Sequence, residues 1–230
     1  MSKKKVGNMR KKGSLILGIL LLVIGLVFIF YQPIMGYFIS NMSKATIEQQ
    51  DIALAMKNQD ASFDFQQVDD LNIKDVVKAQ FNQKKLNAIG AISVPQVNMR
   101  LPILYGVSNT NLAIGAGTMK PEQKMGKANY ALAGHNMNNG KALFSPLTNA
   151  EEGMQVYVTD FKKIYEYKIN KMHIVQPEQV DVINDSNEKM ITLVTCNYDG
   201  SKRLIIQGEW VETMRYDKTL ANNIFANKQS

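Results

Sequence analysis

An uncharged apolar segment near the amino terminus places the strongest constraint on this chain of 230 residues. Residues 13–43 carry no charged side chain, and the run from Leu15 to Tyr31 is apolar apart from two glycines. A helix over residues 13–31 spans about 28 Å, close to the roughly 30 Å hydrocarbon core of a bilayer. A cleaved signal peptide would have a shorter apolar region and a small-x-small cleavage site, which the following QPIMGYFIS lacks. We therefore predict an uncleaved transmembrane helix over residues 13–39.

The formal net charge of +7 is concentrated ahead of this segment. Six of the 27 basic residues lie within residues 1–12, and removing them leaves 21 basic against 20 acidic residues. By the positive-inside rule, the basic tail of residues 1–12 stays in the cytoplasm and the chain from about residue 44 lies outside. The nearly neutral remainder argues against a nucleic-acid-binding protein. The sequence thus predicts a single-pass protein of the cell membrane with an extracellular domain.

The composition after the apolar segment separates a stalk from a folded domain. We expect residues 40–80 to form a polar stalk that ends in a helix, because apolar residues from Ile73 to Phe81 recur at spacings of three and four. Residues 81–230 contain many short runs rich in Val, Ile and Tyr, separated by Gly, Asn, Pro and Asp, and they predict an antiparallel sandwich or closed barrel. The runs are AIGAISV, RLPILY, NYALAG, MQVYVTD, KIYEYKI, MITLVTC and RLIIQGEWV. The segment DKTLANNIFANK is expected to be a short final helix or a loose end.

Three side chains at the ends of these runs are candidates for chemistry. Cys196, the single cysteine, ends MITLVTC, His135 follows NYALAG, and Arg203 begins RLIIQGEWV. A thiol with its usual pKa of about 8.5 needs a nearby base or cation to act as a nucleophile, and histidine is the usual partner. An arginine can stabilise the oxyanion of a tetrahedral intermediate. An Asp-Gly turn in the loop NYDGSK would bring Cys196 and Arg203 onto neighbouring antiparallel strands.

Other motifs receive structural interpretations. His173 lies in a probable strand between apolar and charged residues, and we interpret it as structural. The run from Gly106 to Gly117 lacks the Lys-Ser/Thr pair of a phosphate loop and is interpreted as turns around a short strand or helix. Two separated histidines and one cysteine do not form a zinc site.

The residues leave three interpretations open. The first is a cysteine enzyme built on Cys196, His135 and Arg203. The second is an exported cysteine peptidase of another architecture, although a papain-like enzyme would place its cysteine on a helix ahead of its histidine. The third is a membrane-tethered extracellular binding domain with an incidental cysteine, which predicts no thiol reactivity.

The cysteine run carries a resemblance to a known family. Thr192-Leu193-Val194-Thr195-Cys196 resembles the TLxTC signature of the sortases, the cysteine transpeptidases of Gram-positive bacteria. The upstream Ala133-Gly134-His135 and the downstream Arg203 resemble the family's histidine and arginine segments, so the resemblance covers about residues 88–211. The single amino-terminal span, the polar ending ANNIFANKQS and the lack of an Asp-Pro lid motif resemble class A rather than class C. Class B stays an alternative, although its longer insertion before the cysteine strand is not evident.

The resemblance implies a closed, mainly antiparallel eight-stranded β-barrel with short helices and a defined reaction. Cys196 would attack the Thr-Gly bond of an LPxTG-type sorting signal, His135 would act as general acid and then base, and Arg203 would stabilise the oxyanion. The product would be joined to the amine of a lipid II-type peptidoglycan precursor. Residues implied for the oxyanion hole and the substrate groove are Thr195, Ala133, Thr192 and Val194.

The resemblance implies no cofactor, and the sequence predicts no metal site. Some class A sortases bind calcium through carboxylates in the loop after the first strand and in the loop before the cysteine strand. Here no Asp or Glu occurs from Val76 to Pro121, although the later loop carries Asp181, Asp185 and Glu188. Because calcium requires several oxygen ligands, we predict calcium-independent activity.

Overall fold

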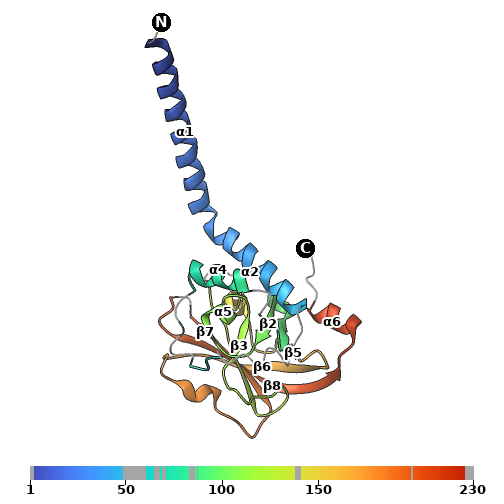
Figure 1. The fold of residues 1–230 in the computed structure, drawn as a ribbon. Coiled ribbons are helices and arrows are strands. Elements are labelled where there is room, and N and C mark those ends of the chain that lie inside the picture. The colour runs from blue at the N-terminus through green and yellow to red at the C-terminus, as the bar shows by residue number, and fades with distance from the viewer. Residues whose placement is uncertain are drawn as a thin grey trace. The chain divides into compact units, whose positions relative to one another are not determined.

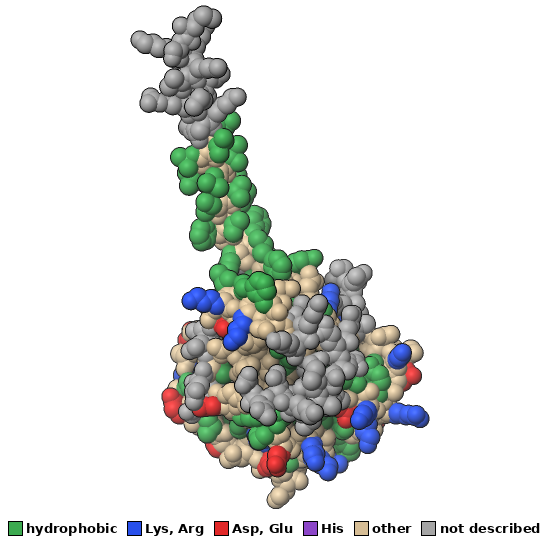
Figure 2. Space-filling model, viewed as in Figure 1, with side chains coloured by type: hydrophobic (Ala, Val, Ile, Leu, Met, Phe, Trp, Pro, Cys, Tyr) green, Lys and Arg blue, Asp and Glu red, His purple; other side chains and the backbone are tan. Residues whose placement is uncertain are grey.

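The computed structural model describes residues 3–48, 61–64, 68, 71–82, 86, 88–137, 141–197 and 199–225. The chain divides into two compact units, Met1–Phe38 and Ile39–Ser230. The first unit contains α1 (Lys3–Ile29) and the start of α2 (Tyr31–Glu48). Hydrophobic side chains cover the described surface of α1 (Figure 2), as the exposure of Leu21 and Phe28 illustrates.

The apolar segment forms helices in the structure, but they are interrupted. Within the described residues, no one helix combines the length and the apolar character needed to cross a bilayer. The segments Leu15–Ile29 and Pro33–Ile47, which are bent at the break between them, meet those two requirements only when taken together. The transmembrane helix over residues 13–39 therefore stays a prediction.

The second unit is built on a closed barrel of eight strands, and this confirms the predicted fold class (Figure 1). The strands follow the order β1-β2-β3-β4-β7-β8-β6-β5 around the barrel, and β5 closes it on β1. All neighbours are antiparallel except two parallel pairs, β2 with β3 and β4 with β7. The strand bounds are β1 Gly90–Val94, β2 Met99–Leu104, β3 Ala116–Thr118, β4 Asn129–Ala133, β5 Gln155–Thr159, β6 Lys163–Val175, β7 Met190–Cys196 and β8 Arg203–Arg215.

The barrel core explains why these runs form strands. In β5, Val156 and Val158 are fully buried while Gln155 and Tyr157 are half-exposed, which is the two-residue alternation of a strand with one buried face. In β4 and β7 nearly every side chain is buried, because these strands are covered on both faces. Complete burial of an aliphatic side chain contributes about 1.5–3 kcal/mol, so these strands stabilise the centre of the fold.

Short helices cover the barrel, and their bounds are α4 Ile73–Asn82, α5 Asn109–Leu112, α6 Lys218–Phe225, η3 Pro95–Val97, η4 Ser145–Asn149 and η5 Val180–Ile183. The predicted helix α4 begins after Asn72, whose side chain accepts a hydrogen bond from the backbone N–H of Asp75. Its expected apolar stripe differs in detail: Val76 is buried, whereas Ile73 and Phe81 are exposed. Ala79 supplies the second buried contact, so α4 rests on a narrower face than its periodicity predicts.

Candidate active site

The register of the adjacent strands β4, β7 and β8 places the three predicted catalytic residues at the same height along the barrel. In the antiparallel pair of β7 and β8, Cys196 lies directly opposite Arg203. In the parallel pair of β4 and β7, Ala133 lies beside Val194. Continuing that register by two residues places His135 beside Cys196, and neighbouring strands are about 4.8 Å apart. Residues two apart on a strand share a face, so His135, Cys196 and Arg203 belong to the face on which Val194 lies.

Hydrogen bonds join the ends of β4 and β7 beyond the last ladder pair. The backbone N–H of Gly134 donates to the carbonyl of Val194 at 3.1 Å. The buried hydroxyl of Thr195 donates to the carbonyl of Gly134 at 2.7 Å. The side-chain amide of Asn136 donates to the carbonyl of Cys196 at 3.0 Å. His135 therefore lies between two residues, Gly134 and Asn136, that are hydrogen-bonded to the strand that carries Cys196.

A close contact with an aromatic ring requires glycine before the histidine. A Cβ atom on Gly134 would lie 2.6 Å from Cγ of Phe144, which is too close for any other residue without displacement of the ring. The backbone N–H of Phe144 also donates to the carbonyl of His135 at 2.9 Å. His135 is itself buried, with 8% of its surface exposed. Phe144 therefore packs against Gly134 at the strand end and fixes the backbone of His135 by a hydrogen bond.

The turn between β7 and β8 is closed by local hydrogen bonds. The backbone N–H of Asn197 donates to the carbonyl of Lys202 at 3.0 Å, and Gly200 adopts a positive φ of 77°. The carboxylate of Asp199 accepts hydrogen bonds from the side chain and the backbone of Ser201, which lower its pKa. The Arg203 guanidinium donates through Nη1 to the carbonyls of Gly200 and Lys202, each at 3.3 Å. The expected pairing of Cys196 and Arg203 on neighbouring antiparallel strands is thus present, although the turn is closed by the Gly200 N–H donating to the carbonyl of Asn197 at 3.1 Å rather than centred on Asp-Gly. Arg203 is oriented by the backbone of its own turn.

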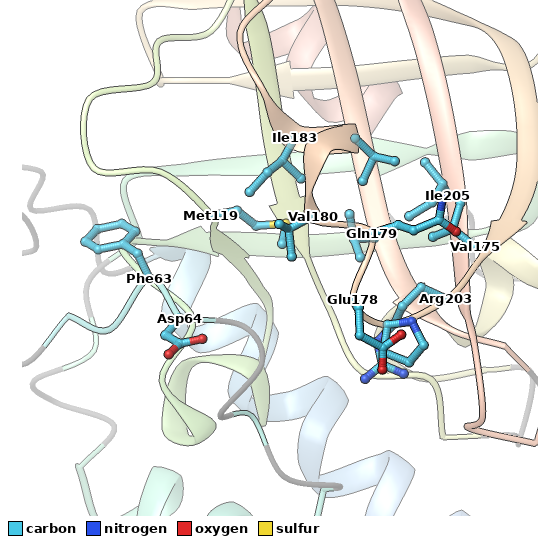
Figure 3. Close-up of a pocket in the computed structure, with 13 residues that line it drawn as sticks. Phe63, Asp64, Met119, Val175, Glu178, Gln179, Val180, Ile183, Arg203 and Ile205 are labelled. Carbon is cyan, nitrogen blue, oxygen red and sulfur yellow. The ribbon is translucent and has the colours of Figure 1, made fainter.

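A pocket of about 650 Å³ opens on this side of the barrel (Figure 3). Its floor is apolar, with Val194 and Ile205 contributed by β7 and β8, and Arg203 borders the same pocket. The loop before β7 supplies another wall, which includes Glu178 and Val180. The pocket can therefore bind an extended peptide with apolar side chains and place a polar backbone beside a cation.

The wall formed by the loop before β7 is held by a buried asparagine. The side-chain amide of Asn129 donates to the carbonyls of Val182 and Asn184, at 3.1 and 3.0 Å. The hydroxyl of Thr192 donates to the side-chain oxygen of Asn129 at 2.8 Å. Thr192 on the signature strand thus positions η5 through Asn129.

The remaining predicted site residues have clear positions. Ala133 is fully buried in a cluster with Val194 and Ile205, and Val194 also borders the pocket. His173 lies within β6 opposite Ile205 of β8. Burial, together with the charge of Lys171, lowers the pKa of His173.

Two supporting residues, Asn129 and Asn136, are not identified by the sequence patterns. Asn129 begins NYALAG and Asn136 follows His135 directly, so proximity to the candidate residues was the only signal that could have identified them. Their roles depend on contacts across about 60 residues of sequence, which no local pattern reveals.

The metal prediction concerns carboxylates in the loop before β7. Within the described ranges, no three His, Cys, Asp or Glu side chains form a group that could hold a metal ion. Asp185 forms an ion pair with Lys120 at 2.5 Å, and the same ammonium group donates to the carbonyl of Asn129 at 2.8 Å. Calcium-independent activity stays a prediction, and a several-fold rise in rate with millimolar calcium, reversed by a chelator, would show it to be wrong.

Comparison with known proteins places this arrangement in a family. The family model of the sortase domain matches residues 92–211. Sortase A of Streptococcus agalactiae is 39% identical over 228 residues, covering 92% of this chain and 90% of the relative. Sortase A of Listeria monocytogenes is 36% identical over 217 residues, covering 92% of this chain and 98% of the relative. The crystal structure of sortase A from Listeria monocytogenes superimposes with a TM-score of 0.59 at 36% identity, covering 61% of this chain and 99% of that one.

The fold and its relatives together define a cysteine transpeptidase. The chain belongs to the sortase family, and its similarity to sortase A proteins over most of its length places it in class A. Members of this class cleave LPxTG signals and anchor proteins to the cell wall, and this chain has that activity. Family membership selects a cysteine transpeptidase over the two alternatives, an exported cysteine peptidase of another architecture and a tethered binding domain.

Proposed function

We propose that Cys196 is the nucleophile of this transpeptidase. Its thiolate attacks the carbonyl carbon of threonine in the sorting signal, and the bond between threonine and glycine breaks. The product is a thioester between Cys196 and the threonine carbonyl, and glycine leaves as a free amine. The direct pairing of Cys196 with Arg203, at the level reached by His135, is the observation that carries this proposal.

His135 and Arg203 complete the proposed reaction. His135 donates a proton to the departing glycine amine and later accepts one from the incoming amine, which is general acid and base catalysis. Arg203 places a permanent cation beside the tetrahedral oxyanion, where a charge-assisted hydrogen bond is stronger than a neutral one. Amine attack on the thioester forms the new amide and releases Cys196 for another cycle.

The four groove and oxyanion-hole residues are proposed to act in different ways. Val194 contacts the signal from the pocket floor. Ala133 lies beneath the groove beside Val194, and Thr192 supports the groove by acting through Asn129 on the loop before β7. Thr195 supports the oxyanion hole as a positioning residue, because its single hydroxyl hydrogen is donated to the carbonyl of Gly134.

The setting of the enzyme is proposed from the amino-terminal segment. Residues 13–39 anchor the chain in the cell membrane, residues 1–12 remain in the cytoplasm, and residues 81–230 form the extracellular catalytic domain. Six cations ahead of an uncharged apolar segment support this orientation. The substrates are then secreted proteins that bear LPxTG, and the acceptor is the amine of a lipid II-type precursor.

Transfer of a labelled peptide tests the proposal. The full-length chain, solubilised in detergent, is incubated with an LPxTG peptide and an amine, and products are identified by mass. The wild type is expected to release the segment that begins with glycine and to join the threonine end to the amine. Cys196→Ala is expected to form neither product. A fully active Cys196→Ala variant would contradict the assignment of the nucleophile.

A further inference from the structure

A segment far from the signature strand in the sequence lies against the barrel beside the pocket. The carbonyl of Ser62 accepts a hydrogen bond from the backbone N–H of Val107 at 2.7 Å. Gly106 permits this approach, since a Cβ atom there would lie 2.8 Å from the carbonyl oxygen of Ser62, and its φ is 84°. Residues 61–64 therefore pack closely against the backbone at Gly106 and Val107, where the absence of a side chain on Gly106 makes room for them.

The aromatic residue of this segment is fixed at the edge of the pocket. The Phe63 ring makes an edge-to-face contact with Tyr105, with centroids 5.1 Å apart and an interplanar angle of 79°. Phe63 borders the pocket that Arg203 also borders, and its side chain is only half-buried. Figure 3 shows Phe63 and Arg203 on opposite sides of the pocket, with Met119 and Val180 between them. The Phe63 ring is thus held by its contact with Tyr105 while the residue still contributes to the pocket wall.

The direction of a bound signal follows from the two ends of the pocket. With the Thr-Gly bond beside Cys196 and Arg203, the residues before threonine extend across Met119 and Val180, at about 3.3 Å per residue in extended backbone. Leucine is the apolar residue that lies farthest from the cleaved bond within LPxTG. We propose that Phe63 is a specificity-determining residue that contacts this leucine. The inference rests on the proposed function for the position of the cleaved bond.

A double-mutant cycle between enzyme and peptide tests the contact. Affinity is measured for the LPxTG peptide and for a peptide with alanine in place of leucine, using full-length Cys196→Ala and full-length Cys196→Ala with Phe63→Ala. Because Cys196→Ala is expected to bind the peptide without cleaving it, the measurement reports affinity alone, and the separate transfer assay tests whether Cys196 is the nucleophile. Phe63→Ala is expected to weaken binding of the leucine peptide about tenfold, as for a lost contact in an apolar pocket. It should change binding of the alanine peptide by less than about twofold.

Turnover by the chain that retains Cys196 gives an independent measurement. Phe63→Ala is expected to raise KM for the leucine peptide and to leave kcat nearly unchanged, because the ring is remote from the reacting bond. Tyr105→Ala is expected to give a smaller rise in KM, since Tyr105 acts by holding the ring. Phe81→Ala provides the matched control, as Phe81 is 86% exposed on α4. An equal loss of affinity for both peptides, or a loss in kcat alone, would overturn the inference.

Discussion

The strands on either side of the β7–β8 pair, β4 and β6, each lead to a histidine. The two histidines differ in whether the backbone around them is part of a strand ladder. His173 lies inside β6, which is paired with β8 from Lys163 to Val175. His135 lies beyond the last ladder pair of β4, where Thr195 and Asn136 replace ladder hydrogen bonds with side-chain ones. The backbone of His173 is therefore held by the β6–β8 ladder, whereas His135 lies between residues held by individual hydrogen bonds to β7. The comparison leads us to assign the proposed chemistry to the ends of the strand ladders, and the following predictions test that assignment.

Substitution of each histidine by asparagine is expected to give the largest difference in transfer rate. His135→Asn is expected to lower kcat/KM for peptide transfer by roughly 10²–10⁴-fold, which is the usual contribution of a general acid or base. His173→Asn is expected to leave transfer within about threefold of the wild type. The rates are measured by mass under identical conditions, with folding checked by circular dichroism. Equal losses from the two variants would show that the distinction between strand interior and strand end is wrong.

Substitution of Arg203 is expected to cause the next largest loss of activity, because Arg203 begins β8 opposite Cys196. Arg203→Ala is expected to lower kcat by about 10²–10³-fold, which is the usual cost of removing one oxyanion donor. Lys202→Ala, one residue earlier in the exposed turn, is the matched control and should retain nearly full activity. Arg203→Lys should recover only part of the rate, since an ammonium lacks the planar fork of a guanidinium. A fully active Arg203→Ala variant would contradict the oxyanion role.

The hydrogen bond between the two strand ends predicts an intermediate effect. Thr195→Val keeps the shape of the side chain but leaves the carbonyl of Gly134 without its 2.7 Å donor. Loss of a buried partner costs about 1–3 kcal/mol of stability, and displacement of His135 is expected to lower kcat about tenfold. Thr195→Ser retains the hydroxyl and should restore most of the activity. Unchanged kcat in Thr195→Val would show that this bond does not position the site.

The β6–β8 region should respond in stability rather than in catalysis. Glu166 lies opposite Glu212, and burial together with that charge raises the pKa of Glu166. A raised carboxyl pKa means that ionisation of Glu166 costs more free energy in the folded state than in the unfolded state. The stability contributed by the protonated carboxyl is therefore complete at low pH and is lost as pH rises through the raised pKa. Glu212→Gln is expected to raise the melting temperature by roughly 1–3 °C at pH 7. The gain should shrink near pH 4, and a larger gain at low pH would contradict this account.

The sequence predicts the strands best where local pattern and burial agree. The run MITLVTC coincides with β7, which is buried almost throughout as a continuous apolar run predicts, and the alternation in MQVYVTD matches the alternating burial of β5. The three residues of β3 carry too little pattern to distinguish a strand from a turn. Phe81 is exposed although its spacing predicts a buried position, because Ala79 completes the narrow face of α4.

The residues of the candidate site also differ in whether a local sequence pattern identifies them. Cys196, His135 and Arg203 are identifiable because their residue types and strand-end positions suit a cysteine nucleophile. The roles of Asn129 and Phe63 arise from contacts with segments distant in the sequence, and the sequence gives no period or motif that marks them. Prediction from one sequence therefore identifies candidate reacting groups at strand ends, and it misses supporting residues that long-range contacts bring to the site.

Direct detection of the thioester tests the central claim, that Cys196 at the end of β7 carries the acyl group. The full-length chain is incubated with an LPxTG peptide in the absence of an added amine, and the reaction is quenched in acid. The protein is then digested, and the mass of the fragment that contains Cys196 is measured by mass spectrometry. The account predicts a mass increase equal to the peptide acyl group ending in threonine, located on Cys196 and absent from Cys196→Ala. Location of the acyl group on another residue, or its absence while transfer proceeds normally, would contradict the account.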